Sequence, residues 1–277
     1  MTTIEAFLEA LTLERVAPDR YRAPNIRMGH NVVFGGQLLA QSIVAGLTGH
    51  AGKTVKTVHT VFARGASPES PVEISVDPMH SGRSFSSSTV TISQDDRLCT
   101  RSIVLLSADE PDLIRHGDVS TTASTPEASE ILQEGSGAWE VRVVGGVDVS
   151  DPDAVGPAEL DVWTRFVGAP DDPTTNQALV AFATDGFLIG AAMRPHPGVG
   201  QAQAHVTIST GVISHTLTFH EPCAASEWLL LSHRSPYAGR GRSYGRADVF
   251  RADGQLVASF VQDSMIRAMS APRAGGL

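Results

Sequence analysis

Hydrophobic and polar residues alternate along the chain in a pattern that occurs twice. Three runs with the two-residue period of β-strands lie between His59 and Ser107, and three more lie between His215 and Met265. The last two runs of each set are joined by a polar turn, at 94–97 and at 251–254. The pattern therefore predicts an antiparallel meander that is present twice.

A helix precedes each meander. Apolar residues at helical spacing occupy 36–47 and 175–184, and a short strand-like run precedes each of these segments, at 20–24 and at 139–144. A helix and a run of antiparallel strands, repeated, are typical of an α+β fold in which a sheet wraps one central helix.

The repeat also predicts the domain organisation. His59 aligns with His215 at an offset of 215 − 59 = 156, and Ser84 aligns with Ser243 at 243 − 84 = 159. From these equivalences we expect a shared structural role for His59 and His215. The stretch between the copies is rich in Ser, Thr, Asp, Glu and Gly, as surface connections are. We predict an N-terminal unit over 1–108, a linker over 109–138 and a C-terminal unit over 139–277.

Composition and charge narrow the class of protein. The 277 residues are 42% hydrophobic and 18% charged, which is enough for a buried core. No apolar run approaches the ~18 residues needed to cross a bilayer, and no signal peptide is recognisable at the N-terminus, so we expect a cytoplasmic protein without a membrane partner. A net charge of −9 argues against nucleic acid as a partner. The two cysteines and ten histidines have no metal-site spacing, so we expect neither metal nor cofactor.

Two polar residues stand in apolar surroundings. Asp185 closes an apolar helix, where desolvation would raise its pKa toward that of a useful general base; the alternative is a carboxylate that accepts backbone hydrogen bonds beside Gly186. Gln262 alternates with Ala258 and Phe260 on one strand face. Its amide can hold a water through both its donor and its acceptor, or it can be a core residue tied to the backbone.

Gly35 and Gly36 open the first helix. Backbone N–H groups at a helix N-terminus can bind an oxyanion or a phosphate, and a closely packed helix entry is the alternative. The first helix carries no acid, so we expect one catalytic centre per chain.

Eight colinear motifs resemble the type II acyl-CoA thioesterases, the TesB-like family. They are Val33–Gln41, His59–Pro68, Gly82–Ser86, Trp139–Arg142, Val162–Arg165, Ala178–Asp185, Phe219–Leu231 and Asp253–Arg267. The resemblance implies a tandem double hotdog, two antiparallel sheets each wrapping a central helix. It also implies hydrolysis of fatty acyl-CoA to free fatty acid and CoA, by a water that Asp185, Gln262 and a strand hydroxyl bind and activate.

The strand hydroxyl of that family is missing here. Counting back from Phe219 puts Val212 at its position, and valine offers no hydrogen bond. Thr210 and Ser214 lie two residues away, roughly 6.6 Å along a regular strand. A β-bulge at Gly211 would bring one of them into place.

Acyl-CoA is the expected partner, and its phosphates require local positive charge. Arg83 and Arg242, in glycine-flanked segments that open paired strands, are the candidates, together with Arg240 and Arg246. Hotdog sheets associate edge to edge, so a homo-oligomer is a further expectation from the resemblance.

Two other functions stay open. Val212 motivates a non-catalytic acyl-CoA or lipid-binding hotdog protein. A hotdog enoyl-CoA hydratase would pair an Asp with a His, and the absence of a His close to Asp185 in the sequence argues against it.

Overall fold

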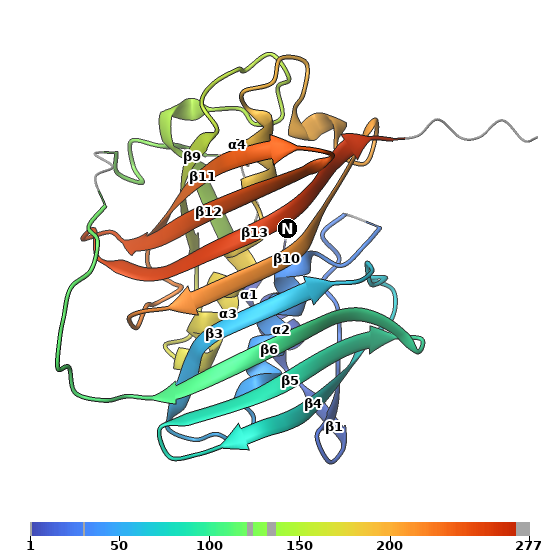
Figure 1. Cartoon of the computed structure of the whole chain (residues 1–277), viewed down its shortest axis with the longest axis vertical. Coiled ribbons are helices and arrows are strands. Elements are labelled where there is room, and N and C mark those ends of the chain that lie inside the picture. Colours follow the sequence, from blue (N-terminus) through green and yellow to red (C-terminus); the bar gives the residue numbers. More distant parts are fainter. Residues whose placement is uncertain (1, 30, 121–123, 132–136, 270–277) are drawn as a thin grey trace, which may run out of the picture.

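The strands form one continuous antiparallel sheet (Figure 1). The computed structural model describes residues 2–29, 31–120, 124–131 and 137–269, and within them the sheet has 13 strands. In spatial order these are β1 (Glu14–Ala17), β2 (Arg20–Ala23), β4 (Val72–Ser81), β5 (Phe85–Gln94), β6 (Arg97–Ala108), β3 (Lys53–Phe62), β10 (Ile208–Phe219), β13 (Leu256–Ala268), β12 (Arg242–Arg251), β11 (Leu229–Gly239), β9 (Glu159–Phe166), β8 (Trp139–Val143) and β7 (Glu130–Ile131).

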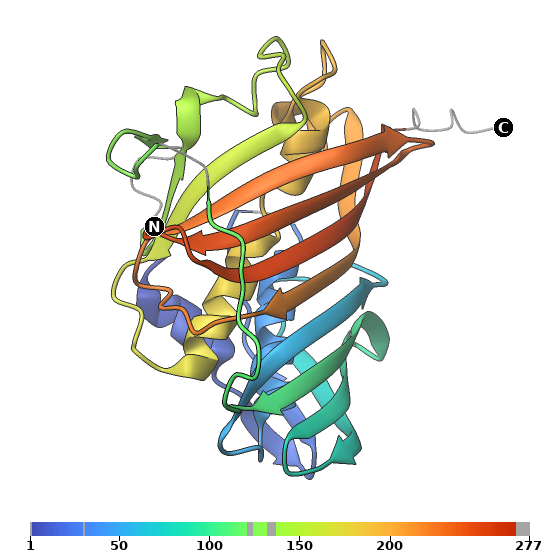
Figure 2. The same ribbon diagram turned by 60° about the vertical axis from the view of Figure 1, so that its left-hand side comes forward.

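The helices lie against one face of this sheet, which curves around them (Figure 2). They are α1 (Ile4–Leu11), α2 (Gly35–Leu47), α3 (Pro173–Thr184) and α4 (Leu188–Met193), with 3-10 turns at Val144–Gly146 and Gln201–Gln203. The start of α3 follows from its sequence, because Asp172 Oδ2 accepts the N–H of Thr175 at 2.8 Å and Pro173 occupies the first turn. None of these helices combines the length and apolarity needed to cross a bilayer.

Strands β3 and β10 join the two halves of the sheet. Residues 57–61 of β3 pair in antiparallel register with residues 214–218 of β10. The double meander predicted from the sequence is confirmed, and the two predicted sheets meet edge to edge along this pair. The two central helices, α2 and α3, pack against each other beneath the same junction.

The expected equivalence of His59 and His215 is wrong. His59 pairs with Thr216 and His215 pairs with Thr60, so the two histidines lie on opposite faces of the sheet. His215 and Thr60 are fully buried on the helix side, whereas His59 Nδ1 lies 2.7 Å from Thr216 Oγ1 on the other side. Equivalent residues of two equivalent strands must lie on the same face. The register of β3 with β10 puts residues 156 apart on opposite faces, so an offset of 156 does not relate equivalent positions here.

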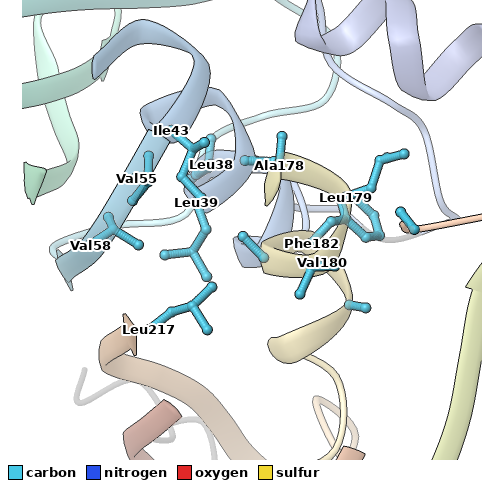
Figure 3. Packing of buried hydrophobic residues seen from close by; sticks show 14 of the residues in the cluster. Leu38, Leu39, Ile43, Val55, Val58, Ala178, Leu179, Val180, Phe182 and Leu217 are labelled. Atoms are coloured by element: carbon cyan, nitrogen blue, oxygen red, sulfur yellow. The ribbon is translucent and has the colours of Figure 1, made fainter. Parts of the chain in front are cut away.

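The core lies between the helices and the sheet (Figure 3). Leu39 of α2, Val58 of β3 and Leu217 of β10 are all fully buried there. The two central helices approach closely at Gly36, where a Cβ atom would come within 2.2 Å of the Phe182 carbonyl oxygen. Glycine is therefore required at this crossing, and it brings the start of α2 to the end of α3.

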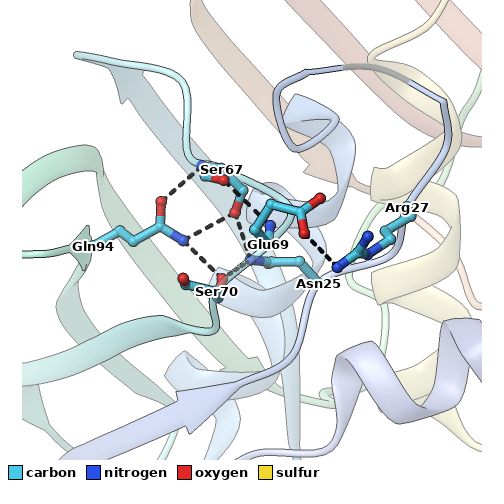
Figure 4. Close-up of polar contacts among 6 residues, drawn as sticks. All are labelled: Asn25, Arg27, Ser67, Glu69, Ser70 and Gln94. Atoms are coloured by element: carbon cyan, nitrogen blue, oxygen red, sulfur yellow. Dashed lines mark hydrogen bonds and ion pairs between the residues drawn. The ribbon is translucent and has the colours of Figure 1, made fainter.

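A polar network fixes the loop that follows β3, residues 63–71, beside the start of α2 (Figure 4). Gln94 accepts the N–H of Ser67 at 2.7 Å and donates to the carbonyls of Ser67 and Ser70, and Asn25 donates to the same two carbonyls. Asn25 in turn accepts from Gln37 in the first turn of α2 at 2.7 Å. The network holds the N-terminus of α2 in place.

Candidate functional site

Asp185 lies where the end of α3 meets the start of α2. It is the C-cap residue of α3, and the N–H of Gly36 donates to its carboxylate. Gly35 lies beside the same carboxylate, because a Cβ at this residue would be 2.5 Å from Asp185 Oδ2. The sequence left two interpretations of Asp185, a general base and an acceptor of backbone hydrogen bonds beside Gly186. The carboxylate does accept a backbone hydrogen bond, but it comes from Gly36 of α2 and not from the end of α3.

Burial dominates the acidity of Asp185. The residue is 9% exposed, and desolvation raises the pKa of its carboxyl to about 7. Hydrogen bonds from the Gly36 N–H and from the Gln262 side chain act in the opposite direction and are the smaller effects. A carboxylate with this pKa is close to half ionised at neutral pH, where a general base works best.

Gln262 contacts Asp185 directly. Its Nε2 donates to Asp185 Oδ1 at 3.0 Å, which joins β13 to the end of α3. The Gln262 Oε1 atom is buried and has no hydrogen-bond partner among the described residues. A buried acceptor without a partner carries a free-energy penalty of roughly 1–3 kcal/mol unless a water or ligand satisfies it. The amide is therefore placed to accept a hydrogen bond from a bound water.

His215 completes this cluster, and sequence reasoning missed it. It lies opposite Gln262 on the neighbouring strand, with its Nδ1 3.3 Å from Gln262 Nε2 and 3.9 Å from Asp185 Oδ1. Its Nε2 lies 3.1 Å from Thr184 Oγ1. Burial lowers the pKa of His215 to about 3, so the imidazole is neutral. The only sequence signal was its place, three residues after Val212 on the strand that carries the family hydroxyl.

The bulge in β10 lies two residues beyond its expected place at Gly211. Gly211 pairs regularly with Met265, and the register shift falls between Val212 and Ser214, so that Ile213 is the extra residue. The shift turns Ser214 to the outer face, where its Oγ donates to Asp263 Oδ2 at 2.9 Å. The structure therefore does not bring Ser214 to Asp185.

Thr210 lies on the inner face but is distant. It pairs with Ile266, four residues beyond Gln262, which is about 13 Å along a strand. Val212 pairs with Ser264, whose side chain is almost fully buried on the same face as Gln262. Ser264, about 7 Å along β13 from Gln262, is therefore a second inner-face hydroxyl near this position.

The two arginines expected to bind phosphate are not brought together. Arg83 precedes β5 at the end of the sheet where β3 begins, and Arg242 begins β12 opposite Met265, at the end where β10 begins. Arg242 is three residues of register, about 10 Å, from the level of Gln262. The end of β13 lies against the turn that precedes Arg242, through the bond from the Ile266 N–H to the Gly241 carbonyl. Three arginines share this corner: Arg240, Arg242 and Arg267.

A cleft of about 970 Å³ lies away from Asp185, at the opposite end of α3. Its wall combines apolar side chains such as Phe85 and Trp228 with carboxylates such as Asp171, Glu221 and Glu227. The surplus of negative charge makes it unsuited to CoA phosphates. Within the described ranges, no group of three His, Cys, Asp or Glu side chains is arranged to hold a metal ion.

Two models of known protein domains match most of the chain. Residues 116–266 match the model of the acyl-CoA thioesterase C-terminal domain, and residues 23–107 match that of the acyl-CoA thioesterase N-terminal domain. The chain belongs to the acyl-CoA thioesterase family. The order of the two domains in this family matches the order of the two halves of the sheet.

Individual family members resemble the chain over nearly its whole length. Acyl-CoA thioesterase 2 of Haemophilus influenzae is 26% identical, with 94% of this chain and 96% of that protein covered. Human acyl-coenzyme A thioesterase 8 is 24% identical, with 93% and 87% covered. The structure of a tesB protein from Mycobacterium avium subsp. paratuberculosis superimposes with a TM-score of 0.82 at 26% identity, covering 96% of this chain and all of that one. The predicted double hotdog is thereby confirmed.

Proposed function

We propose that the chain hydrolyses fatty acyl-CoA thioesters to free fatty acid and CoA. The observation that carries this proposal is the contact between Asp185 and Gln262 in a chain of the acyl-CoA thioesterase family. The contact leaves one acceptor, Gln262 Oε1, buried and available beside a carboxylate whose pKa is about 7. These two groups are what a water needs to be held and deprotonated.

The reaction begins with a water that donates one hydrogen bond to Gln262 Oε1 and the other to the ionised Asp185. As the water oxygen attacks the thioester carbon, Asp185 takes its proton, and the carbonyl oxygen becomes an oxyanion. The C–S bond then breaks, and the CoA sulfur leaves with the proton held by Asp185. The acid is released and the carboxylate is regenerated, so that no cofactor takes part.

The glycines at the start of α2 have two roles in this proposal. Gly36 uses its N–H to hold Asp185, and the N–H of Gly35, in the first turn of the helix, is the oxyanion donor. We place the CoA phosphates at the corner of Arg240, Arg242 and Arg267, at the end of the sheet where β10 begins and about 10 Å along β12 from the level of Gln262. Arg83 has no part in it.

The hydroxyl of the family has no counterpart on β10 in this proposal. Thr210 is too far along the strand, Ser214 faces away, and Val212 has no hydroxyl. We therefore assign binding of the water to Asp185 and Gln262 alone.

The decisive experiment measures thiol release from acyl-CoAs of several chain lengths by the purified chain and by Asp185→Asn. We expect turnover by the native chain and a loss of at least about 100-fold in the variant, since a general base contributes 10²–10⁴ in rate. Binding of acyl-CoA without any thiol release would instead support the non-catalytic function.

One observation favours a second candidate, the enoyl-CoA hydratase. The sequence argument against it was the absence of a His near Asp185, and in the structure His215 Nδ1 is 3.9 Å from Asp185 Oδ1. Against this function, both nitrogens of His215 already have partners, Gln262 and Thr184, and the ring is fully buried. Hydration of an enoyl-CoA with no thiol released would establish this alternative.

The organisation of the protein around this activity is also a proposal. We place the domain bounds at 1–108, 109–138 and 139–277, supported by the end of β6 at Ala108 and the start of β8 at Trp139. A cytoplasmic location, expected from the sequence, and a homo-oligomer formed through sheet edges, expected from the family resemblance, are proposals as well. Fractionation and light scattering of the native chain test them.

A further inference from the structure

The imidazole of His215 has a defined tautomer. Thr184 Oγ1 donates its only hydrogen to the Ala181 carbonyl at 2.8 Å, so toward His215 Nε2 it can only accept. His215 therefore carries its proton on Nε2 and presents a lone pair on Nδ1. The ring is held in place from the side by Phe260, which stacks on it at 5.3 Å between centroids and 12° between planes.

This lone pair determines which way the Gln262 amide points. In the orientation found, the two N–H bonds of Nε2 are directed at two acceptors, Asp185 Oδ1 at 3.0 Å and His215 Nδ1 at 3.3 Å. If the amide were reversed, its oxygen would face a carboxylate oxygen and a nitrogen lone pair, and both contacts would be repulsive. Without His215, only the contact with Asp185 would select the orientation of the amide. That contact would weaken when Asp185 takes the proton of the water.

We infer that His215 is a positioning residue: held by Thr184, its Nδ1 fixes the Gln262 amide so that Oε1, and not Nε2, faces the reacting water. This inference rests on the proposed function, because it concerns the same water. It explains why a neutral histidine is fully buried in contact with the site although its Nδ1, the nitrogen that faces the site, carries no proton. Through the whole cycle, including the step in which Asp185 is protonated, His215 keeps the water acceptor in place.

A simple packing role makes the opposite prediction for two substitutions. His215→Phe keeps the ring volume and the stacking on Phe260 but removes both nitrogens. His215→Asn leaves a cavity but puts an amide oxygen close to the place of Nδ1, where it can accept from Gln262. If His215 only fills space, the Phe variant is the more active; if it positions Gln262, the Asn variant is.

His233→Phe is the matched control. His233 is also buried, packs on Phe260 at 5.7 Å, and bonds through Nδ1 to the Leu160 carbonyl. Its hydrogen bond goes to Leu160, and its ring contacts are with Phe187 and Phe260. The same substitution there disturbs the same part of the core and leaves the amide of Gln262 alone, so kcat should stay close to native.

The experiment measures kcat and KM for thiol release by the four chains, native, His215→Phe, His215→Asn and His233→Phe, at temperatures below each unfolding transition. We expect kcat to fall about tenfold in His215→Phe with KM little changed, and to recover most of its value in His215→Asn. A Phe variant as active as the Asn variant would overturn the inference. An Asp185→Asn variant that keeps its activity would instead overturn the proposed function.

The pH profile is the second readout. The hydrogen bond from Gln262 lowers the pKa of Asp185, so a reversed amide in His215→Phe should move the acidic limb of kcat/KM to higher pH. Of the basic side chains that the structure describes, His215 is the one within 4.0 Å of the Asp185 carboxylate, and it is neutral. His215→Asn and His233→Phe should keep the native limb. An unmoved limb in His215→Phe would contradict the inference.

Discussion

Gly35 lies so close to Asp185 that a methyl group at residue 35 would be 2.5 Å from Asp185 Oδ2. Gly35→Ala must therefore displace the carboxylate or the start of α2. A displacement of about 1 Å at a reacting group can cost on the order of 100-fold in rate, and we expect kcat/KM for thiol release to fall by this order. Gly117→Ala is the control, since a Cβ there meets nothing within 4 Å. Native activity in Gly35→Ala would mean that Asp185 is not the base.

The rate of thiol release should depend on pH through Asp185. The carboxylate acts only when ionised, and its pKa is about 7, so kcat/KM should rise with pH and level off above this value. Below pH 7 the fall should approach tenfold per pH unit. A profile from pH 4 to 9 checks this; a limb near the ordinary aspartate pKa of 3.8 would contradict a buried base.

The stability of the fold should also depend on pH through Asp185, but it should fall as pH rises, whereas the rate of thiol release rises. Between the ordinary pKa of 3.8 and about 7, the folded chain keeps a proton that the unfolded chain has lost, so stability falls as pH rises through this interval. Asp185→Asn removes this effect. Its stability relative to the native chain should increase between pH 5 and pH 8, by about 3 kcal/mol at most. Urea unfolding at both pH values measures it, and a constant difference would refute it.

His215 also makes the stability of the fold depend on pH, with a slope opposite in sign to that of Asp185. Its pKa is lowered from 6.5 to about 3, so the unfolded chain binds the extra proton between these values and stability rises with pH there. In the native chain the slopes of Asp185 and His215 oppose each other between about pH 4 and 6.5. In Asp185→Asn the opposing slope is lost, while His215 and the likewise buried His233, whose pKa is lowered to about 4, keep theirs, so stability should climb with pH over that interval.

Restoring a hydroxyl at Val212 should raise activity. Val212 lies on the inner face opposite Ser264, and threonine has nearly the same shape. One added hydrogen bond to the water or the oxyanion, of about 1 kcal/mol, corresponds to about a fivefold gain in kcat. Val61→Thr on β3, half exposed, is the matched control and should change nothing. Turnover that appears only in Val212→Thr would show that the native chain is a binding protein.

Local pattern was sufficient for the regular elements. Helical spacing predicted α2 and α3 to within two residues at each end, and strand alternation predicted both meanders. The short helices α1 and α4 were missed, because helices of eight and six residues give too few repeats to establish a period. For α1 a capping signal existed, since Thr3 Oγ1 accepts the N–H of Ala6.

The site was only partly predictable for a different reason. Asp185 and Gln262 stood out because each is polar in an apolar pattern. His215 did not, because its face depends on the single extra residue Ile213, and a one-residue shift in a strand reverses every side chain that follows. The same shift removed Ser214 from the site. Sequence spacing also concealed the distance between His215 and Asp185, which are 30 residues apart in the chain and within 4 Å in space.

The pairing of β3 with β10 joins the two halves of one chain into a single sheet, and because each half has its own sequence, the two can diverge. Two copies of a single half would be bound by symmetry to build the same site at both ends of the helix pair. Within one chain each end can change alone. Here one end holds a carboxylate against a helix N-terminus, and the other has become an acidic cleft. Separating the halves would therefore divide the catalytic end between two molecules, because its glycines and its acid belong to different halves.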